Sequence, residues 1–151
     1  MAISQAMATS FKVEILDGVH NFGSGVVRAS TAADVFKLAL YTSSATLSAS
    51  TTAYSSADEV SSSGTNYPAG GLTLTISQAP TFTSTTAWLD FDDLTFPSAT
   101  LTANGALIYN ATQGNKAVAV LAFGGDKTST AGNFTIQFPA PTSTTAILRI
   151  A

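Results

Sequence analysis

Short stretches in which apolar and polar residues alternate recur along this 151-residue chain. In LTLTI, residues 72–76, Leu72, Leu74 and Ile76 lie on one side of an extended chain and two threonines on the other. The segment FTIQF, residues 134–138, has the same pattern. Because successive side chains of a strand point to opposite faces, this period of two predicts strands with one buried and one exposed face.

Further segments extend the strand pattern over most of the chain. Residues 101–109, LTANGALIY, alternate as well, with Gly105 as a candidate bulge. Residues 117–123, AVAVLAF, are apolar on both faces, which is typical of a strand covered on both sides. The remaining strand candidates are residues 35–42, 51–56, 87–91 and 145–150.

About eight short strands, separated by Ser, Thr, Gly, Pro and Asn, predict an all-β fold. The preferred architecture is an antiparallel β-sandwich in the form of a jelly roll. We expect residues 100–110, 117–123 and 134–138 to form a meander, because short loops cannot hold a crossover helix.

The length of the chain fits a single domain over residues 1–151. Residues 1–34 are expected to form an N-terminal arm with a short helix and a loop, and residues 35–151 the sandwich core. The polar segment at residues 55–71 is the longest predicted loop, and we place it at an edge or tip of the sandwich.

One stretch of the arm, SFKVEILDGVHNF, favours a helix over a strand. Phe11, Ile15 and Val19 recur at helical spacing, although Phe11 also fits an alternating pattern. Ser10 can cap the start of such a helix, and Gly18 can end it. We therefore predict a short helix here.

Composition excludes several classes of partner. The formal net charge is −3 with only six basic residues and no basic cluster, so we expect no binding to nucleic acid. No segment approaches about 20 consecutive apolar residues and the N-terminus has no charged leader, so we expect no membrane contact and no export. Without cysteine, neither disulfides nor thiolate metal ligands can hold the fold.

The segment GGDK, residues 124–127, invites comparison with a phosphate-binding loop. Such a loop needs glycine, four residues, then Gly-Lys-Ser/Thr at the start of a helix. Here Asp126 separates glycine from lysine, and the next periodic segment is another strand at Phe134. We interpret GGDK as a turn at which a strand ends.

The acidic segment DFDD, residues 90–93, raises the possibility of calcium, which prefers clustered carboxylates. The spacing of a full ligand loop is missing. We interpret Asp90 and Asp92 as exposed residues of a strand edge that ends in a bulge, and predict no metal site.

Catalytic constellations are not recognisable in the sequence. His20 is the only histidine, and no Gly-x-Ser-x-Gly segment supplies a nucleophile for it. Glu14 and Glu59 give no sign of the paired carboxyls of a glycosidase. We expect no enzymatic activity and no cofactor.

Trp88 shares a predicted strand face with Asp90, and an exposed aromatic ring beside an acid is one form of sugar-binding surface. A tryptophan in a core or interface is the commoner case. The acceptor patterns NAT at Asn110 and NFT at Asn133 are interpreted as turns rather than glycosylation sites, because no export signal is recognised.

Several blocks follow one another along the chain in a characteristic order. They are FKLALYTSSATLSASTTAY, YPAGGLTLT, GALIYN, AVAVLAFGGDKTSTAGNFTIQFP and AILRI. In combination they resemble a family of small virion proteins of tailed bacteriophages, over roughly residues 10–22 and 35–151. The similarity implies a structural component of the virion that is made in the cytoplasm of the bacterial host.

Within that family, the resemblance favours a capsid decoration, or cement, protein that binds the outside of the shell and stabilises it. The expected partners are the major capsid protein and further copies of this chain, as a dimer or trimer on the capsid lattice. A head–tail connector, tail or fibre component, and a carbohydrate-binding module, are the alternatives. Candidate contact residues are Phe11, His20, Asn21, Phe22, Tyr67 and Trp88.

Overall fold

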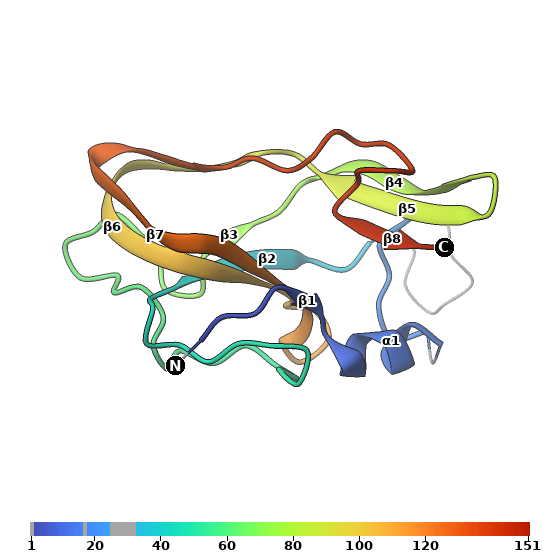
Figure 1. The fold of residues 1–151 in the computed structure, drawn as a ribbon, viewed down its shortest axis with the longest axis horizontal. Coiled ribbons are helices and arrows are strands. Elements are labelled where there is room, and N and C mark those ends of the chain that lie inside the picture. The colour runs from blue at the N-terminus through green and yellow to red at the C-terminus, as the bar shows by residue number, and fades with distance from the viewer. Residues whose placement is uncertain (1, 17, 25–32) are drawn as a thin grey trace.

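The chain folds into two packed layers of antiparallel strands with one short helix beneath one end (Figure 1). The computed structural model describes residues 2–16, 18–24 and 33–151, so part of the predicted loop of the arm, residues 25–32, lies outside the description. Eight strands and one helix are found in these residues. They are β1 (Ala6–Met7), α1 (Thr9–Leu16), β2 (Phe36–Tyr41), β3 (Leu72–Thr73), β4 (Ile76–Thr83), β5 (Thr86–Phe91), β6 (Leu94–Asn110), β7 (Lys116–Ile136) and β8 (Leu148–Ile150).

The strands form one sheet in the order β1-β7-β6-β2-β3 and a second in the order β4-β5-β8. The long hairpin of β6 and β7 runs through the lower layer, bends at one end of the molecule, and returns along the upper layer towards β5 (Figure 1). Bulges permit this bend: between the pairs Ala103–Lys127 and Gly105–Ala122, one residue of β6 lies opposite four residues of β7. The predicted antiparallel β-sandwich is therefore confirmed; its jelly-roll connectivity stays a prediction.

Strand segments that are apolar on both faces form the centre of the core. Residues 106–110 of β6 and 117–121 of β7 are buried throughout, as predicted for residues 117–123 from their composition. Aromatic rings extend this core towards the second sheet: Phe22 stacks on Phe36 at a centroid distance of 4.1 Å, and Phe36 lies 6.1 Å from Phe91. Full burial of each such side chain contributes about 1.5–3 kcal/mol.

Several local predictions are confirmed. Strands cover most of residues 35–42 and 87–91, a register shift falls at Gly105, and residues 134–138 alternate in burial. Helix α1 lies largely in the predicted stretch and ends at Leu16; shortly after it, Gly18 has a φ of 68° and donates its N–H to the carbonyl of Ile15 (3.0 Å).

The predicted turn at GGDK is wrong, and so is the separate third strand of the meander. Residues 124–127 lie inside β7, which continues to Ile136 opposite β6. Gly124 and Gly125 have φ values of 73° and 140°, so these glycines allow the bulge that bends the strand rather than a turn that ends it.

Other predicted boundaries also need correction. Residues 51–56 contribute only a bridge from Ala53 to Lys116, and residues 72–76 are divided between β3 and β4. Ser10 does not cap α1, because the helix begins at Thr9 and the buried Ser10 hydroxyl makes no hydrogen bond to any residue that the structure describes.

The long loop at residues 55–71 pairs with the end of β2 that β3 does not cover, at the edge of the larger sheet, which agrees with the predicted edge position. Thr42 donates its N–H to the carbonyl of Asp58, and Val60 to that of Leu40. In the part of the chain that the structure covers, no helix is long and apolar enough to cross a membrane.

Candidate functional site

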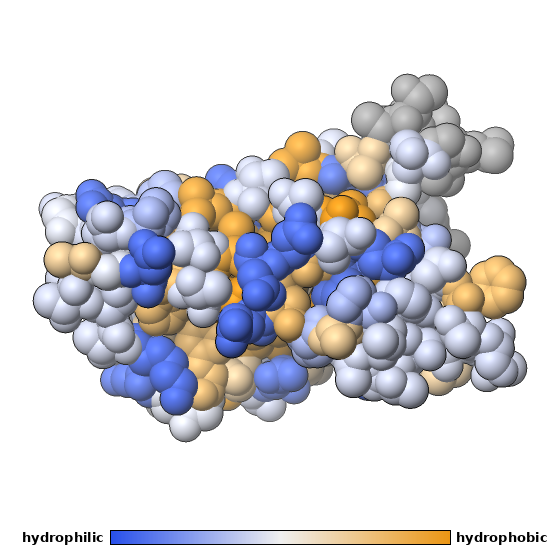
Figure 2. Space-filling view, turned by 90° about the horizontal axis from the view of Figure 1, so that it is seen from above, coloured by the Kyte–Doolittle hydropathy of each residue, from blue (hydrophilic) through white to orange (hydrophobic). Residues whose placement is uncertain are grey.

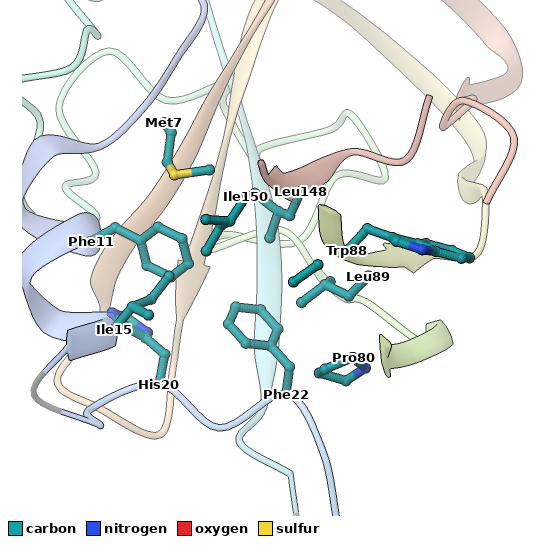
Figure 3. Close-up of a pocket in the computed structure, with 11 residues that line it drawn as sticks. Met7, Phe11, Ile15, His20, Phe22, Pro80, Trp88, Leu89, Leu148 and Ile150 are labelled. Atoms are coloured by element: carbon teal, nitrogen blue, oxygen red, sulfur yellow. The ribbon is translucent and has the colours of Figure 1, made fainter. Parts of the chain in front are cut away.

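An apolar cavity of about 170 Å³ separates helix α1 from the three-stranded sheet (Figure 3). We call it the α1 cavity. Its walls come from β1, α1, the segment after α1, and all three strands of the small sheet. They consist of Met7, Phe11, Ile15, His20, Phe22, Pro80, Ala87, Trp88, Leu89, Leu148 and Ile150.

Backbone hydrogen bonds hold α1 in position over this cavity. Ala8 donates to the carbonyl of Val118 (3.1 Å), and Thr9 donates to that of Ala49 (2.8 Å), which ties the start of the helix to the larger sheet. The left-handed conformation of Gly18 then turns the chain back. As a result His20 packs against Phe11, edge to face, at a centroid distance of 4.7 Å.

His20 is the most polar residue of the cavity wall, and a buried hydrogen-bond network fixes its ring. The Asn110 amide nitrogen lies 3.0 Å from His20 Nδ1 and donates to Asp34 Oδ2 at 2.8 Å. Asn110 Oδ1 accepts the N–H groups of Thr112 and Gln113, which defines the orientation of the amide. With one amide hydrogen on Asp34, the other points to Nδ1, so His20 accepts at Nδ1.

The apolar face of the small sheet continues beyond the cavity. Phe82, Ala87 and Ile150 lie directly opposite one another on β4, β5 and β8, so their side chains share one face. We call these three residues the hairpin row. Phe82 is 76% exposed and Ile150 is 53% exposed. Neither residue was predicted as a contact: Ile150 lies in the predicted strand 145–150, whereas Phe82 lies beyond the predicted strand 72–76.

Four of the six candidate contact residues, Phe11, His20, Phe22 and Trp88, line the α1 cavity. Of these, Phe11 and Phe22 are buried, whereas His20 and Trp88 are half-buried. Asn21 is also buried and donates its backbone N–H to Asp34 Oδ2 (3.0 Å). The cavity thus brings together four residues that the sequence predicted as separate contact candidates, although the buried residues, Phe11 and Phe22, present little surface to a partner.

Tyr67, the sixth candidate, belongs to a separate cluster around Glu59. Glu59 Oε1 accepts the Tyr67 hydroxyl (2.6 Å) and the Gly70 N–H (2.7 Å), while Oε2 accepts the Tyr54 hydroxyl (2.7 Å). The Tyr67 hydroxyl also accepts the N–H of Leu40 at 2.9 Å. We call these residues the Glu59 cluster; it fastens the long loop to β2.

All four tyrosines of the chain lie in or beside this cluster, and their pKa values are raised. Tyr109 donates to the carbonyl of Gly70 (2.7 Å) and stacks on Tyr54 at 4.7 Å. Tyr41 donates to the carbonyl of Ser55. Burial is the main cause of each raised pKa, and for Tyr54 and Tyr67 the hydrogen bond to Glu59 raises the pKa further. The phenols therefore act as neutral donors.

The interpretation of Asp90 as an exposed acid is wrong. Its side chain is fully buried; Oδ1 accepts the N–H of Phe91 (2.9 Å), and Oδ2 has no hydrogen-bond partner in the described part of the chain. Burial raises the pKa of Asp90. Asp92 and Asp93 are exposed. Asp90 lies on the strand face opposite Phe91, which packs towards Phe22 and Phe36, so alternation alone did not predict the burial of Asp90.

Trp88 is half-buried, and its Nε1 lies 3.4 Å from the Thr83 hydroxyl. Because Asp90 is buried, the pair does not form an exposed aromatic and acidic surface. Among the described residues, no three of the His, Asp and Glu side chains are grouped closely enough to hold a metal ion. Asn110, of the NAT pattern, is fully buried and caps the β6–β7 turn.

Searches with this chain against protein-family models, curated proteins and solved structures give no match. Function is therefore inferred from the residues, their geometry and the sequence resemblance alone.

Proposed function

We propose that this protein is a non-enzymatic structural component of a tailed-phage virion, and specifically a capsid decoration protein. It binds the outside of the assembled shell, contacts the major capsid protein, and stabilises the shell. The sequence blocks that resemble small virion proteins are the starting point of this proposal, and the β-sandwich is compatible with it.

The observation that carries the proposal is that the clustered polar side chains of the protein hold its fold together. The titratable side chains that lie close together, Glu59 with its tyrosines and Asp34 with Asn110, are occupied in hydrogen bonds that hold loops and turns. Such groups stabilise the fold and are poorly placed to react with a substrate. A repeated structural contact needs shape and rigidity instead.

The exposed surface supports the same conclusion. Charged residues make up 10% of the chain, against a typical value of about 25%. Thr95 and Thr135, and likewise Thr102 and Thr128, pair their hydroxyls across β6 and β7 at 2.9 Å. Seen from above, the molecule shows broad areas of intermediate hydropathy with scattered hydrophilic patches (Figure 2). A surface of this kind binds by complementary packing, which repetition on a lattice strengthens.

The test is co-sedimentation of purified protein with expanded capsids that lack it, followed by electron microscopy of the pellet. We expect saturable binding, density on the outer surface, and hundreds of copies per particle. Because the surface is poor in charge, the dissociation constant should change less than about threefold between low salt and about 1 M salt. Bare shells, with the protein confined to the neck or tail of virions in few copies, would refute the decoration role.

A further inference from the structure

The hairpin row leaves an unusual amount of apolar surface in contact with water. Among the large apolar residues that the structure describes, Phe82 has the highest exposed fraction, ahead of Ile150 and Val35. Ala87 and Ile150 also line the α1 cavity, so the exposed row begins at the cavity wall. An apolar group projects at the end of the molecule where the β4–β5 hairpin lies (Figures 1 and 2).

The α1 cavity has the size and lining of a site for one aromatic ring. Its volume of about 170 Å³ is close to that of an engineered cavity of about 150 Å³, in another protein, that takes up benzene. Phe11, Phe22 and Leu148 supply ring and branched aliphatic walls, as Figure 3 shows. A cavity of this kind is costly when empty, because its lining atoms lose contacts.

Charge around the hairpin does not oppose the approach of an identical surface. The chain contains no Asp, Glu, Lys or Arg from Val60 to Leu89, a stretch that includes β4 and the first four of the six residues of β5. Arg149 of β8 lies opposite Trp88, on the face of the sheet away from the hairpin row. Two copies that meet through this row therefore bring no like charges face to face there.

We propose that the hairpin row is the contact surface for a second copy of this chain, with Phe82 of each copy inserted into the α1 cavity of the other. Phe82 and the cavity are neighbours on one surface, so a two-fold axis between them places each ring at the opposite cavity. Such an exchange is self-complementary and closes at the dimer. The three residues of the hairpin row are uncharged in both copies, and the ring that the row exposes matches the size of the cavity that it borders.

The first test is sedimentation equilibrium of the full chain over a range of concentrations. We expect a monomer–dimer equilibrium for the parent and a dissociation constant at least about 30-fold weaker for Phe82→Ser, as for a central interface residue. Val35→Ser is the matched control, because Val35 is also exposed, at 46%, but is not part of the cavity wall. Its dimer should match the parent within about twofold.

A second variant separates insertion from general apolar adhesion. Ala87→Trp adds apolar surface at the exposed cavity wall while filling the space that the partner's ring would enter. If Phe82 enters the cavity of the partner, Ala87→Trp should weaken dimerisation at least about 30-fold relative to the parent. If the two copies only adhere through apolar surface, the variant should associate more strongly than the parent. Far-ultraviolet circular dichroism and urea unfolding of each variant establish that it is folded.

Three outcomes would overturn the proposal: a parent that stays monomeric at millimolar concentration, a dimer that Phe82→Ser leaves intact, or a dimer strengthened by Ala87→Trp. If the parent is monomeric and Phe82→Ser instead abolishes capsid binding, the row contacts the shell and the self-contact is refuted. If the Phe82→Ser variant is monomeric but still binds capsids, the proposed virion role does not depend on the self-contact.

Discussion

Replacing Tyr67 by phenylalanine removes a single hydroxyl that takes part in one buried and one partly buried hydrogen bond. The hydroxyl donates to Glu59 Oε1 at 2.6 Å and accepts the N–H of Leu40 at 2.9 Å. Tyr67 is 2% exposed and Leu40 is fully buried, so water cannot replace the lost partner. The variant therefore leaves one buried N–H unpaired and removes one of three donors from Glu59.

The expected loss of stability follows from these two contacts. A hydrogen bond to a charged group contributes about 1.5–3 kcal/mol, and an unpaired buried N–H costs about 1–3 kcal/mol. We expect the free energy of unfolding to fall by about 3–4 kcal/mol. For a chain of this size, each kcal/mol lowers Tm by about 2–4 °C, so the Tm should fall by about 6–16 °C.

Tyr54→Phe is the matched control because it removes a hydroxyl from the other oxygen of the same carboxylate. Tyr54 is half-buried and its hydroxyl makes one hydrogen bond, to Glu59 Oε2 at 2.7 Å. Water can satisfy much of that loss, so we expect a cost of about 1 kcal/mol. Urea unfolding of both variants, with unchanged m-values, gives the comparison. A smaller loss for Tyr67→Phe than for Tyr54→Phe would refute the assignment of Tyr67 as the central donor.

Three further predictions concern pH, a buried acid and a close backbone contact. Folding raises the tyrosine pKa values, so their contribution to the free energy of unfolding should be complete below pH 10 and decline above it, as urea unfolding at increasing pH would show. Because burial raises the pKa of Asp90, Asp90→Asn should stabilise the protein at pH 7 and lose that advantage below about pH 4, whereas Asp92→Asn should have no effect; an equal gain at both pH values would contradict this. A Cβ at Gly71 would lie 1.7 Å from the carbonyl oxygen of Leu38, so Gly71→Ala should cost more than about 3 kcal/mol, against about 1 kcal/mol for Gly114→Ala, which has a similar φ but open space; equal losses in Tm would refute the steric cause.

The strands were predictable where one face of the chain packs against the core, because apolar and polar residues then alternate along the sequence. Residues 134–138 are an example. The continuation of β7 through Gly124 and Gly125 was not predictable in this way. Two glycines beside Asp126 have the composition of a turn. The strand continues past them because Lys127 pairs with Ala103 of β6, and a pairing between distant residues cannot be predicted from the local sequence.

The α1 cavity, the Glu59 cluster and the hairpin row also differ in how far the sequence predicts them. Phe11 and Phe22 were named from their apolar character, and the fold brings them to one cavity. The Glu59 cluster has no local signal, because its tyrosines come from distant positions and converge only when the long loop lies along β2. Phe82 has a signal that was missed: a large apolar residue alone among threonines, next to a tight hairpin turn.

The distribution of charge connects the stability of the fold with its proposed contacts. Of the nine acidic residues, Asp34 and Asp90 are buried and Glu59 is half-buried, and Glu59 and Asp34 hold loops. Residues 60–89, which include β4 and the start of β5, contain no charged residue at all. Neither a capsid contact nor a self-contact on such a surface depends on ion pairs, so both should survive high salt. Salt therefore cannot separate the two contacts, whereas Phe82→Ser can, because it removes the exposed ring and changes no charge.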